Sequence, residues 1–226
     1  MGRKIFKVAS STNNMATRDK QKLISMMLSK ILSTDCQSNV NFEWLINKPL
    51  KDHFKNRYNS IMKIFSVLNG DITGLNSKHQ MKLSPDAYFS NEWNFIFEFD
   101  ELQHFTKYKK AVLENYPDDL ILGFDKKEYI RLCDKYQIEA LKKGPPGYRK
   151  PKDEFPFENG RAAQRAFFDA FRDFLPEMYD LNPTIRISEF EVRDILEDNP
   201  ENRLKLKQIL IKHFEMSNKH ELIKKL

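Results

Sequence analysis

Three acidic residues lie close together in a segment that otherwise has the composition of a buried strand. Asp86 follows a proline, and Glu98 and Asp100 come shortly after it in the run "NFIFEFD". Side chains alternate along a strand, so Glu98 and Asp100 should share one face, about 6–7 Å apart, and the phenylalanines the other. Neighbouring carboxylates repel one another, and a divalent cation relieves this repulsion. Oxygen ligands favour Mg²⁺, so Asp86, Glu98 and Asp100 are candidate metal ligands.

The spacing of these acids has a second interpretation. A hairpin with one solvent-exposed face would also carry acids, which would serve only solubility. The spacing taken alone favours this simpler explanation, so the choice depends on what surrounds the acids.

Composition and charge limit the class of protein. The chain has 226 residues, of which 40% are hydrophobic and 31% charged, with a net charge of +6, as expected for a globular domain with a real core. Residues 84–140 hold 7 lysines and arginines against 12 acids, whereas residues 1–83 hold 14 against 5. Basic flanks suit a polyanion and an acidic centre suits a cation, although solvated helix faces explain the same distribution.

Several kinds of site and location are not indicated. Cys36 and Cys133 form no CxxC motif, so the sequence predicts neither a disulfide framework nor a zinc site. No apolar run approaches the roughly 20 residues of a membrane span, and the N-terminus has no signal-peptide core. We therefore expect a soluble, cytoplasmic protein without a membrane partner.

Sequence periodicity predicts an α/β layer structure with helical additions at both ends. We treat the chain as one domain with a helical N-terminal region (1–80), a core (81–145) and a C-terminal part (146–226) that begins with a loop. Asn159 can cap the helix that carries Phe167, Phe171, Phe174 and Met178. The predicted helices are 12–32, 42–65 with a break at Pro49, 103–116, 126–136, the helix after Asn159 and the charged C-terminal helices. The predicted strands are 85–89 and 94–100, joined by a hairpin turn, then 137–143 and 183–190, with a turn at 69–76 and a loop at 143–160.

The best candidate for DNA contact is the basic stretch around the proline- and glycine-rich loop. Arginine reads guanine edges, lysine mostly contacts phosphates, and a tyrosine can stack on a base or simply pack. The candidate residues are Lys142, Lys143, Tyr148, Arg149, Lys150, Lys152, Arg161 and Arg165. An ordinary surface loop is the alternative.

The context of the acids resembles a known family. Pro85 and Asp86 followed by "FEFDELQHF" resemble the PD-(D/E)xK nuclease superfamily, and residues 124–141 and 161–192 resemble later parts of such proteins, especially type II restriction endonucleases. The resemblance covers roughly residues 80–192. It implies a restriction-endonuclease-like mixed central sheet flanked by helices, and Mg²⁺-dependent cutting of double-stranded DNA by a homodimer. It further implies a palindromic, AT-rich site and a prokaryotic cell.

The resemblance also assigns roles to residues. Asp86 and Glu98 would hold Mg²⁺ with the Phe99 carbonyl, and Asp100, which replaces the family lysine, would be a third ligand or orient the attacking water. Gln103 and His104 are further candidates for orienting water, and His104 for moving a proton. Glu101 replaces a loop glycine of the motif. Glu43 is a candidate distal ligand, or simply a surface acid.

Two other functions and one structural question stay open. A repair or mobile-element nuclease would share the same core, and a non-catalytic DNA-binding protein would carry a degenerate site. Met26, Met27, Leu28 and Leu32 spread apolar surface beyond one stripe of the N-terminal helix. They are candidates for a dimer interface, or for ordinary core.

Overall fold

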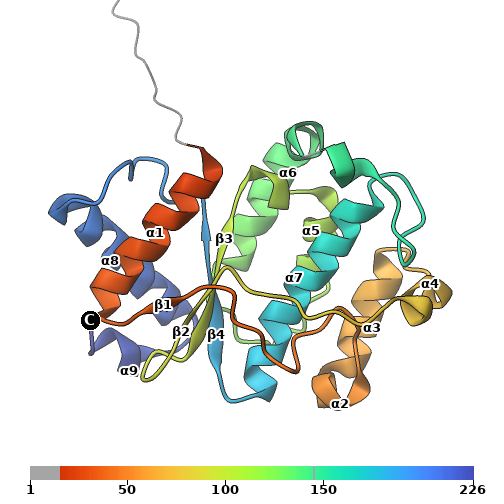
Figure 1. Cartoon of the computed structure of the whole chain (residues 1–226), viewed down its shortest axis with the longest axis horizontal. Helices are drawn as coiled ribbons and strands as arrows, with labels where there is room; N and C mark the ends of the chain where they lie inside the picture. The colour runs from red at the N-terminus through yellow and green to blue at the C-terminus, as the bar shows by residue number, and fades with distance from the viewer. Residues whose placement is uncertain (1–15, 145) are drawn as a thin grey trace, which may run out of the picture.

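A four-stranded mixed sheet with helices on both faces forms the centre of the protein (Figure 1). The computed structural model describes residues 16–144 and 146–226. The strands are β1 (Cys36–Gln37), β2 (Ala87–Phe89), β3 (Phe95–Asp100) and β4 (Asn182–Ser188), in that order across the sheet. Pairing is antiparallel for β1–β2 and β2–β3 and parallel for β3–β4. The predicted mixed α/β architecture is thus confirmed.

The helices differ widely in length. They are α1 (Thr17–Leu32), α2 (Lys51–Phe54), α3 (Tyr58–Val67), α4 (Ile72–Ser77), α5 (Lys107–Glu114), α6 (Lys126–Lys143), α7 (Gly160–Met178), α8 (Pro200–Met216) and α9 (His220–Ile223), with short 3-10 turns η1 (Lys55–Arg57), η2 (Leu102–His104) and η3 (Pro146–Arg149). None of the helices within the described residues combines the length and apolar character that a membrane crossing requires.

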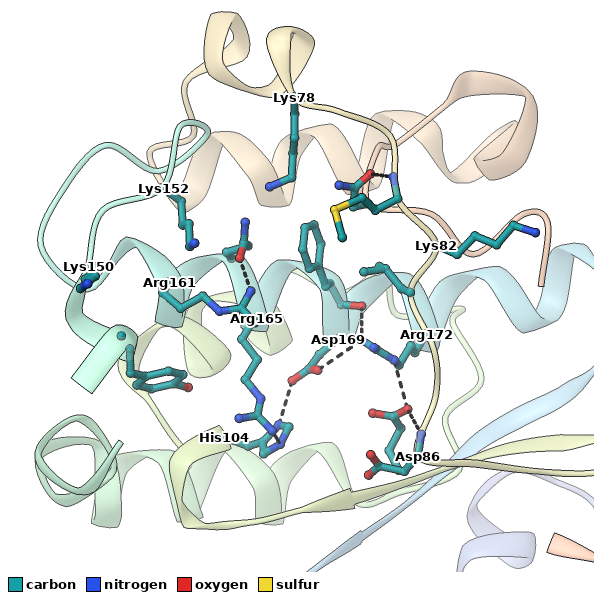
Figure 2. A pocket seen from close by; sticks show the side chains of 18 residues that line it. Lys78, Lys82, Asp86, His104, Lys150, Lys152, Arg161, Arg165, Asp169 and Arg172 are labelled. Carbon is teal, nitrogen blue, oxygen red and sulfur yellow. Dashed lines mark hydrogen bonds and ion pairs between the residues drawn. The ribbon is translucent and has the colours of Figure 1, made fainter. Parts of the chain in front are cut away.

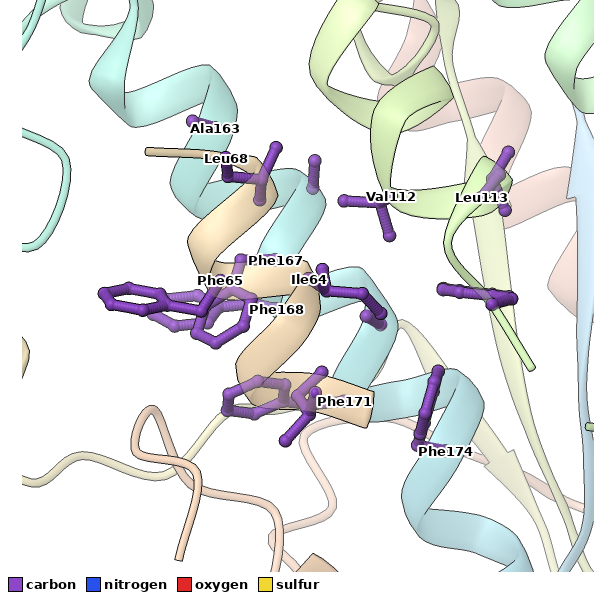
Figure 3. Close-up of a cluster of buried hydrophobic side chains, with 14 of the residues drawn as sticks. Ile64, Phe65, Leu68, Val112, Leu113, Ala163, Phe167, Phe168, Phe171 and Phe174 are labelled. Carbon is purple, nitrogen blue, oxygen red and sulfur yellow. The ribbon is translucent and has the colours of Figure 1, made fainter. Parts of the chain in front are cut away.

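Two separate cores lie on the two faces of the sheet. On one face, Phe95, Phe97 and Phe99 pack with apolar residues of α1 and α8. On the other face, α7 lies across the sheet and packs against α3 and α5 through phenylalanines such as Phe167 and Phe171 (Figure 3). The strand β3 is therefore buried on both faces, which is why all six of its residues are inaccessible.

The hairpin, the β4 strand and the apolar stripe of α7 agree with the sequence prediction. Ala87 faces Phe97 and Phe89 faces Phe95 across the hairpin. Phe167, Phe171 and Phe174 of the predicted stripe are buried. Asn159 does occupy the position before α7, but its backbone is left-handed and its side chain makes no capping bond, so the predicted cap is wrong. The amide of Gly160 is bonded to the Phe157 carbonyl instead.

Several predicted boundaries are wrong. The predicted strand 137–143 is the continuation of α6, because Tyr129, Cys133 and Ala140 keep one buried stripe at helical spacing. Residues 69–76 contain the short helix α4, whose N-terminal amides bond to the Asp71 side chain, rather than a turn alone. The helix expected over 42–65 begins only at α2, and the one expected over 103–116 is η2 followed by α5. Residues 12–15 of the first predicted helix lie outside the described residues.

The N-terminal region contributes to both sides of the sheet. Helix α1 packs on α8, whereas α2 and α3 pack on α7. Met27, Leu28 and Leu32 are fully buried in the chain's own core, and Met26 is 47% exposed. Three of the four candidate interface residues are thus core residues, because α1 and α8 together cover this face of the sheet.

Candidate functional site

The acidic side chains of β3 point toward α7, away from the phenylalanines. Ile96, which shares their face, packs in the core formed with α7. In the parallel register Glu98 lies opposite Arg186 of β4, and Asp100 lies opposite Ser188. The predicted alternation along the strand is therefore correct, but the acids meet a helix and an arginine rather than open solvent.

Asp86 and Glu98 lie side by side, as the sequence predicts. The backbone amide of Asp86 donates to Glu98 Oε1 at 3.3 Å, and the amide of Phe99 donates to Asp86 Oδ2 at 2.8 Å. These bonds arise because Asp86 directly precedes the paired part of β2. The two carboxylates are thus fixed to the same end of the hairpin.

Both carboxylates lie at the floor of one pocket of about 780 Å³ (Figure 2). The walls come from the segment before β2, from the loop before α7 and from α7 itself. Its cationic side chains are Lys78, Lys82, Lys150, Lys152, Arg161, Arg165 and Arg172, and its other polar ones include His104, Gln164 and Asp169. A floor of acids under walls of cations is an arrangement that suits a metal ion together with a phosphate ester.

Glu98 is a carboxylate that burial holds close to neutrality. Its side chain is almost inaccessible, and burial raises its pKa to about 8, against the opposing effect of Arg172 and in the same direction as Asp86. Arg172 Nε lies 3.1 Å from Glu98 Oε1, and Arg186 Nη1 lies 3.9 Å from Oε2. Burial also raises the pKa of Asp86, although the Phe99 amide and His104 act to lower it.

The cation next to Glu98 is itself incompletely bonded. Arg172 donates to the carbonyls of Phe168 and Ser84, but its buried Nε has no hydrogen-bond partner among the described residues. A guanidinium N–H without an acceptor suits the oxygen of an anion such as a phosphate. The oxygen atoms of Asp86 and Glu98 beside it are the kind of donor that Mg²⁺ prefers.

Asp100 lies outside the pocket lining. Arg186 Nη1 donates to both of its oxygens at 3.1 Å, and both side chains are fully buried. Burial alone would raise the pKa of Asp100, but Arg186, His104 and Lys109 together hold it below its usual value. The repulsion expected between Glu98 and Asp100 is thus offset by a protein cation placed between them.

Arg186 connects β4 to α7. Its Nε donates to Asp173 Oδ1 at 2.7 Å and its Nη2 to the Asp169 carbonyl at 3.0 Å. Tyr116 donates to the other oxygen of Asp173 at 2.6 Å. Burial acts to lower the pKa of Arg186, but the surrounding carboxylates hold it well above its usual value. A fully paired arginine of this kind fixes the distance between the sheet and α7.

A second group of possible metal ligands adjoins the pocket, and two of its three members, His104 and Asp169, line it. Atoms of Asp100, His104 and Asp169 lie within 4.8 Å of one another, with His104 Nδ1 at 3.0 Å from Asp100 and 3.2 Å from Asp169. Lys109 Nζ is 3.2 Å from Asp169, so lysine and arginine already neutralise both acids. A hard divalent cation would have to displace protein cations from both acids of this group, whereas at the pair of Asp86 and Glu98 only Glu98 has such partners within the described part of the chain. This group therefore suits Mg²⁺ less well than Asp86 and Glu98.

His104 connects this group to the pocket. Its Nδ1 faces two carboxylates, and its Nε2 contacts the guanidinium of Arg165. The carboxylates favour a proton on Nδ1. The side-chain amide of Gln103, by contrast, donates to Glu101. The backbone carbonyl of Gln103 accepts a hydrogen bond from the Tyr148 hydroxyl at 2.5 Å.

The predicted DNA-contact residues divide into two groups. Tyr148, Lys150, Lys152, Arg161 and Arg165 line the pocket above the acids. Lys142, Lys143 and Arg149 lie outside it, with Lys143 paired to Glu139 and Arg149 donating to the Lys142 carbonyl at 3.1 Å. Tyr148 is buried rather than free to stack. Glu43 is exposed and paired with Lys82, as expected of a surface acid.

Seven charged residues of the site were missed in the sequence, namely Lys78, Lys82, Lys109, Asp169, Arg172, Asp173 and Arg186. A signal exists for the last four. Arg186 interrupts an apolar strand, and Arg165, Asp169, Arg172 and Asp173 recur at helical spacing along one face of α7, beside its phenylalanine stripe. A charged stripe on a helix is normally solvated, so only the tertiary structure distinguishes this one.

A family profile matches part of the chain. The profile of a family of unknown function (DUF7255) matches residues 63–150. No curated protein matches the chain, and no solved structure does. The matched region holds the hairpin with Asp86 and Glu98, but it ends before α7 and β4, which supply Arg172 and Arg186.

Proposed function

We propose that this protein is a Mg²⁺-dependent deoxyribonuclease with the core of the PD-(D/E)xK superfamily. The observation that carries the proposal is the recessed pair of Asp86 and Glu98 at the floor of a pocket with seven cationic side chains in its lining. The pair can hold a divalent cation, and the cationic walls can hold the phosphates of a polyanion.

Roles for individual residues follow from their positions. When bound, Mg²⁺ would lower the pKa of a coordinated water and offset charge on the phosphate. Arg165 and Arg172, which line the pocket beside the acids, would hold the phosphate oxygens. Hydrolysis adds a water oxygen to phosphorus and breaks one ester bond, and the leaving oxygen takes a proton. His104 Nε2, once Arg165 turns to the phosphate, is a group that can accept or return that proton.

In this proposal Asp100 is a structural residue and does not bind the metal ion. Its two bonds to Arg186 place it in the support of the site, where it fixes β3 against β4. No lysine follows Glu98 in the motif, and Arg172 is the cation closest to that carboxylate, at 3.1 Å.

The test is digestion of plasmid DNA with and without Mg²⁺. We expect Asp86→Ala and Glu98→Ala to abolish cutting while circular dichroism stays unchanged, and Asp118→Ala, an exposed acid outside the pocket, to cut normally. Binding of Mn²⁺, followed by electron paramagnetic resonance, should be lost in the first two variants. Cutting at a normal rate by either variant would remove Asp86 and Glu98 from the active site.

The products of the same digest separate the related functions. A restriction endonuclease gives discrete fragments, whereas a repair or mobile-element nuclease gives nicks or a continuous smear. Cutting both strands at a palindrome requires a second copy related by a two-fold axis. Light scattering on the DNA-bound protein should then give the mass of two chains per duplex, and a mass of one chain would exclude the symmetric dimer.

A non-catalytic DNA-binding protein is the second candidate. The observation that favours it is that Arg172 and Arg186 already supply positive charge to Glu98. With these partners, Glu98 does not require a metal ion. Such a protein would shift DNA in a gel and never cut it, at any Mg²⁺ concentration.

A further inference from the structure

The pocket has a second end, opposite the acids. Lys78 follows α4, Lys152 belongs to the loop before α7, and Arg161 lies in the first turn of α7, and their side chains point into the same part of the pocket (Figure 2). Three separate segments thus bring cations together in one place.

Two of these three cations lack an acidic partner among the described residues. Lys78 is paired with the buried Glu154, which also accepts a hydrogen bond from Gln164 at 2.6 Å. Arg161 donates to Gln164, an uncharged amide. Within residues 16–144 and 146–226, no carboxylate lies within 4.0 Å of the side-chain nitrogens of Lys152 or Arg161. Burial and, next, the neighbouring Arg165 lower the pKa of Arg161, which shows the mutual repulsion that an anion would relieve.

An apolar wall lies in the same pocket. Met81, Leu83 and Phe168 are among its lining residues, and Met81 is 60% exposed although it is large and apolar. Phe168 itself is buried, with 7% of its surface exposed, and Lys78 Nζ lies 5.4 Å from its ring. The apolar surface open to a ligand is therefore that of Met81 and Leu83, and the flat face of an unpaired base can pack on it beside the cations.

The size of the pocket limits what can occupy it. About 780 Å³ is within the range of roughly 300–1,000 Å³ that encloses small ligands. In a duplex the bases are stacked inside the helix, so a base can reach Met81 or Leu83 only after it has left the stack.

We propose that the pocket takes one unpaired nucleotide of a DNA strand. The phosphate to be cut lies at Asp86 and Glu98, the base lies against Met81 and Leu83, and a neighbouring phosphate lies on Lys78, Lys152 and Arg161. The hydrolysis rests on the proposed nuclease function, whereas the binding does not require the metal. The preferred substrate is then a single strand, a flap or a frayed end.

The test is binding of a fluorescein-labelled single-stranded oligonucleotide in EDTA, compared with a hairpin duplex of the same sequence, by fluorescence anisotropy. We expect the single strand to bind several-fold more tightly. Lys152→Gln and Arg161→Gln should weaken its binding several-fold and lower the salt slope by about 0.7 for each lost phosphate contact. The matched control is Lys212→Gln, an exposed lysine of α8 outside the pocket, which should leave both quantities unchanged.

The outcomes separate this proposal from the nuclease function. A duplex bound as tightly as the single strand, or equal effects of Lys152→Gln and Lys212→Gln, would overturn the unpaired-nucleotide site even if the protein cuts DNA. The expected binding pattern without cleavage of any DNA would support this site and overturn the nuclease. Lys152 is partly exposed, so its variant should fold, and circular dichroism checks this.

Discussion

Arg186 and Asp100 lie on neighbouring parallel strands, and one guanidinium nitrogen of Arg186 contacts both carboxylate oxygens of Asp100 at 3.1 Å in the fully buried interior. The acid that the sequence places next to Glu98 is therefore a structural partner of an arginine 86 positions later.

The first prediction concerns this pair. Asp100→Ala should lower the free energy of unfolding by roughly 3–5 kcal/mol, because it leaves the Arg186 charge buried with one partner fewer. Asp100→Asn, which keeps an oxygen acceptor for Arg186, should lose less stability. Urea unfolding measures the free energy of unfolding of both variants, with Asp118→Ala as the control. Loss of cutting by Asp100→Ala at unchanged stability would instead make Asp100 a ligand of the site.

The second prediction is a pH dependence due to Glu98. Its folded pKa of about 8 lies above the unfolded value near 4.5, so between these values the folded state keeps a proton that the unfolded state has lost. The contribution of Glu98 to the free energy of unfolding is therefore fully present below about pH 4.5. It falls as the pH rises to about 8, by at most about 1.4 kcal/mol per pH unit. Glu98→Gln should remove this slope and be the more stable protein at pH 9.

Urea unfolding in EDTA at pH 5, 7 and 9 measures the effect. The control is Glu92→Gln in the exposed hairpin turn, which should unfold with the wild-type pH dependence. Identical slopes for wild type and Glu98→Gln would show that the Glu98 carboxylate is not held near neutrality.

The third prediction concerns removal of the metal. EDTA should stop cutting and leave the thermal unfolding midpoint unchanged. The fold rests on apolar burial on both faces of the sheet, and Arg186 and Lys109 neutralise the acids of the second group of possible ligands without an ion. Calorimetry with and without EDTA measures this. A large fall in the midpoint would make the ion structural.

The fourth prediction concerns the wall of the pocket. A Cβ on Gly160 would lie 2.0 Å from the Phe155 carbonyl oxygen, so Gly160→Ala must displace the turn that carries Lys152. It should cost roughly 1–3 kcal/mol of stability and weaken binding of single-stranded DNA. Gly147→Ala is the matched control, since a Cβ there meets nothing within 4 Å. Equal behaviour of the two variants in urea unfolding and anisotropy would contradict the close packing.

The sequence alone determined the local features of this protein. Alternation along "FIFEF" placed Phe95, Phe97 and Phe99 on one face and Glu98 on the other, because side chains on a strand have a period of two. The short polar turn set the hairpin, and with it the contact of Asp86 with Glu98. These features depend on a few neighbouring residues, so a local pattern suffices to predict them.

Only the tertiary structure decided what the acids contact. Asp100 pairs with Arg186, Glu98 with Arg172 and Asp169 with Lys109, and each pair joins residues 60 or more positions apart. The strand expected at 137–143 was wrong for the same reason, since a strand needs a partner that its own sequence does not specify. Periodicity gives the face on which a charge lies. Whether that face meets water, a metal ion or a buried arginine depends on how the sheet and α7 pack together, and that packing arises from the whole chain.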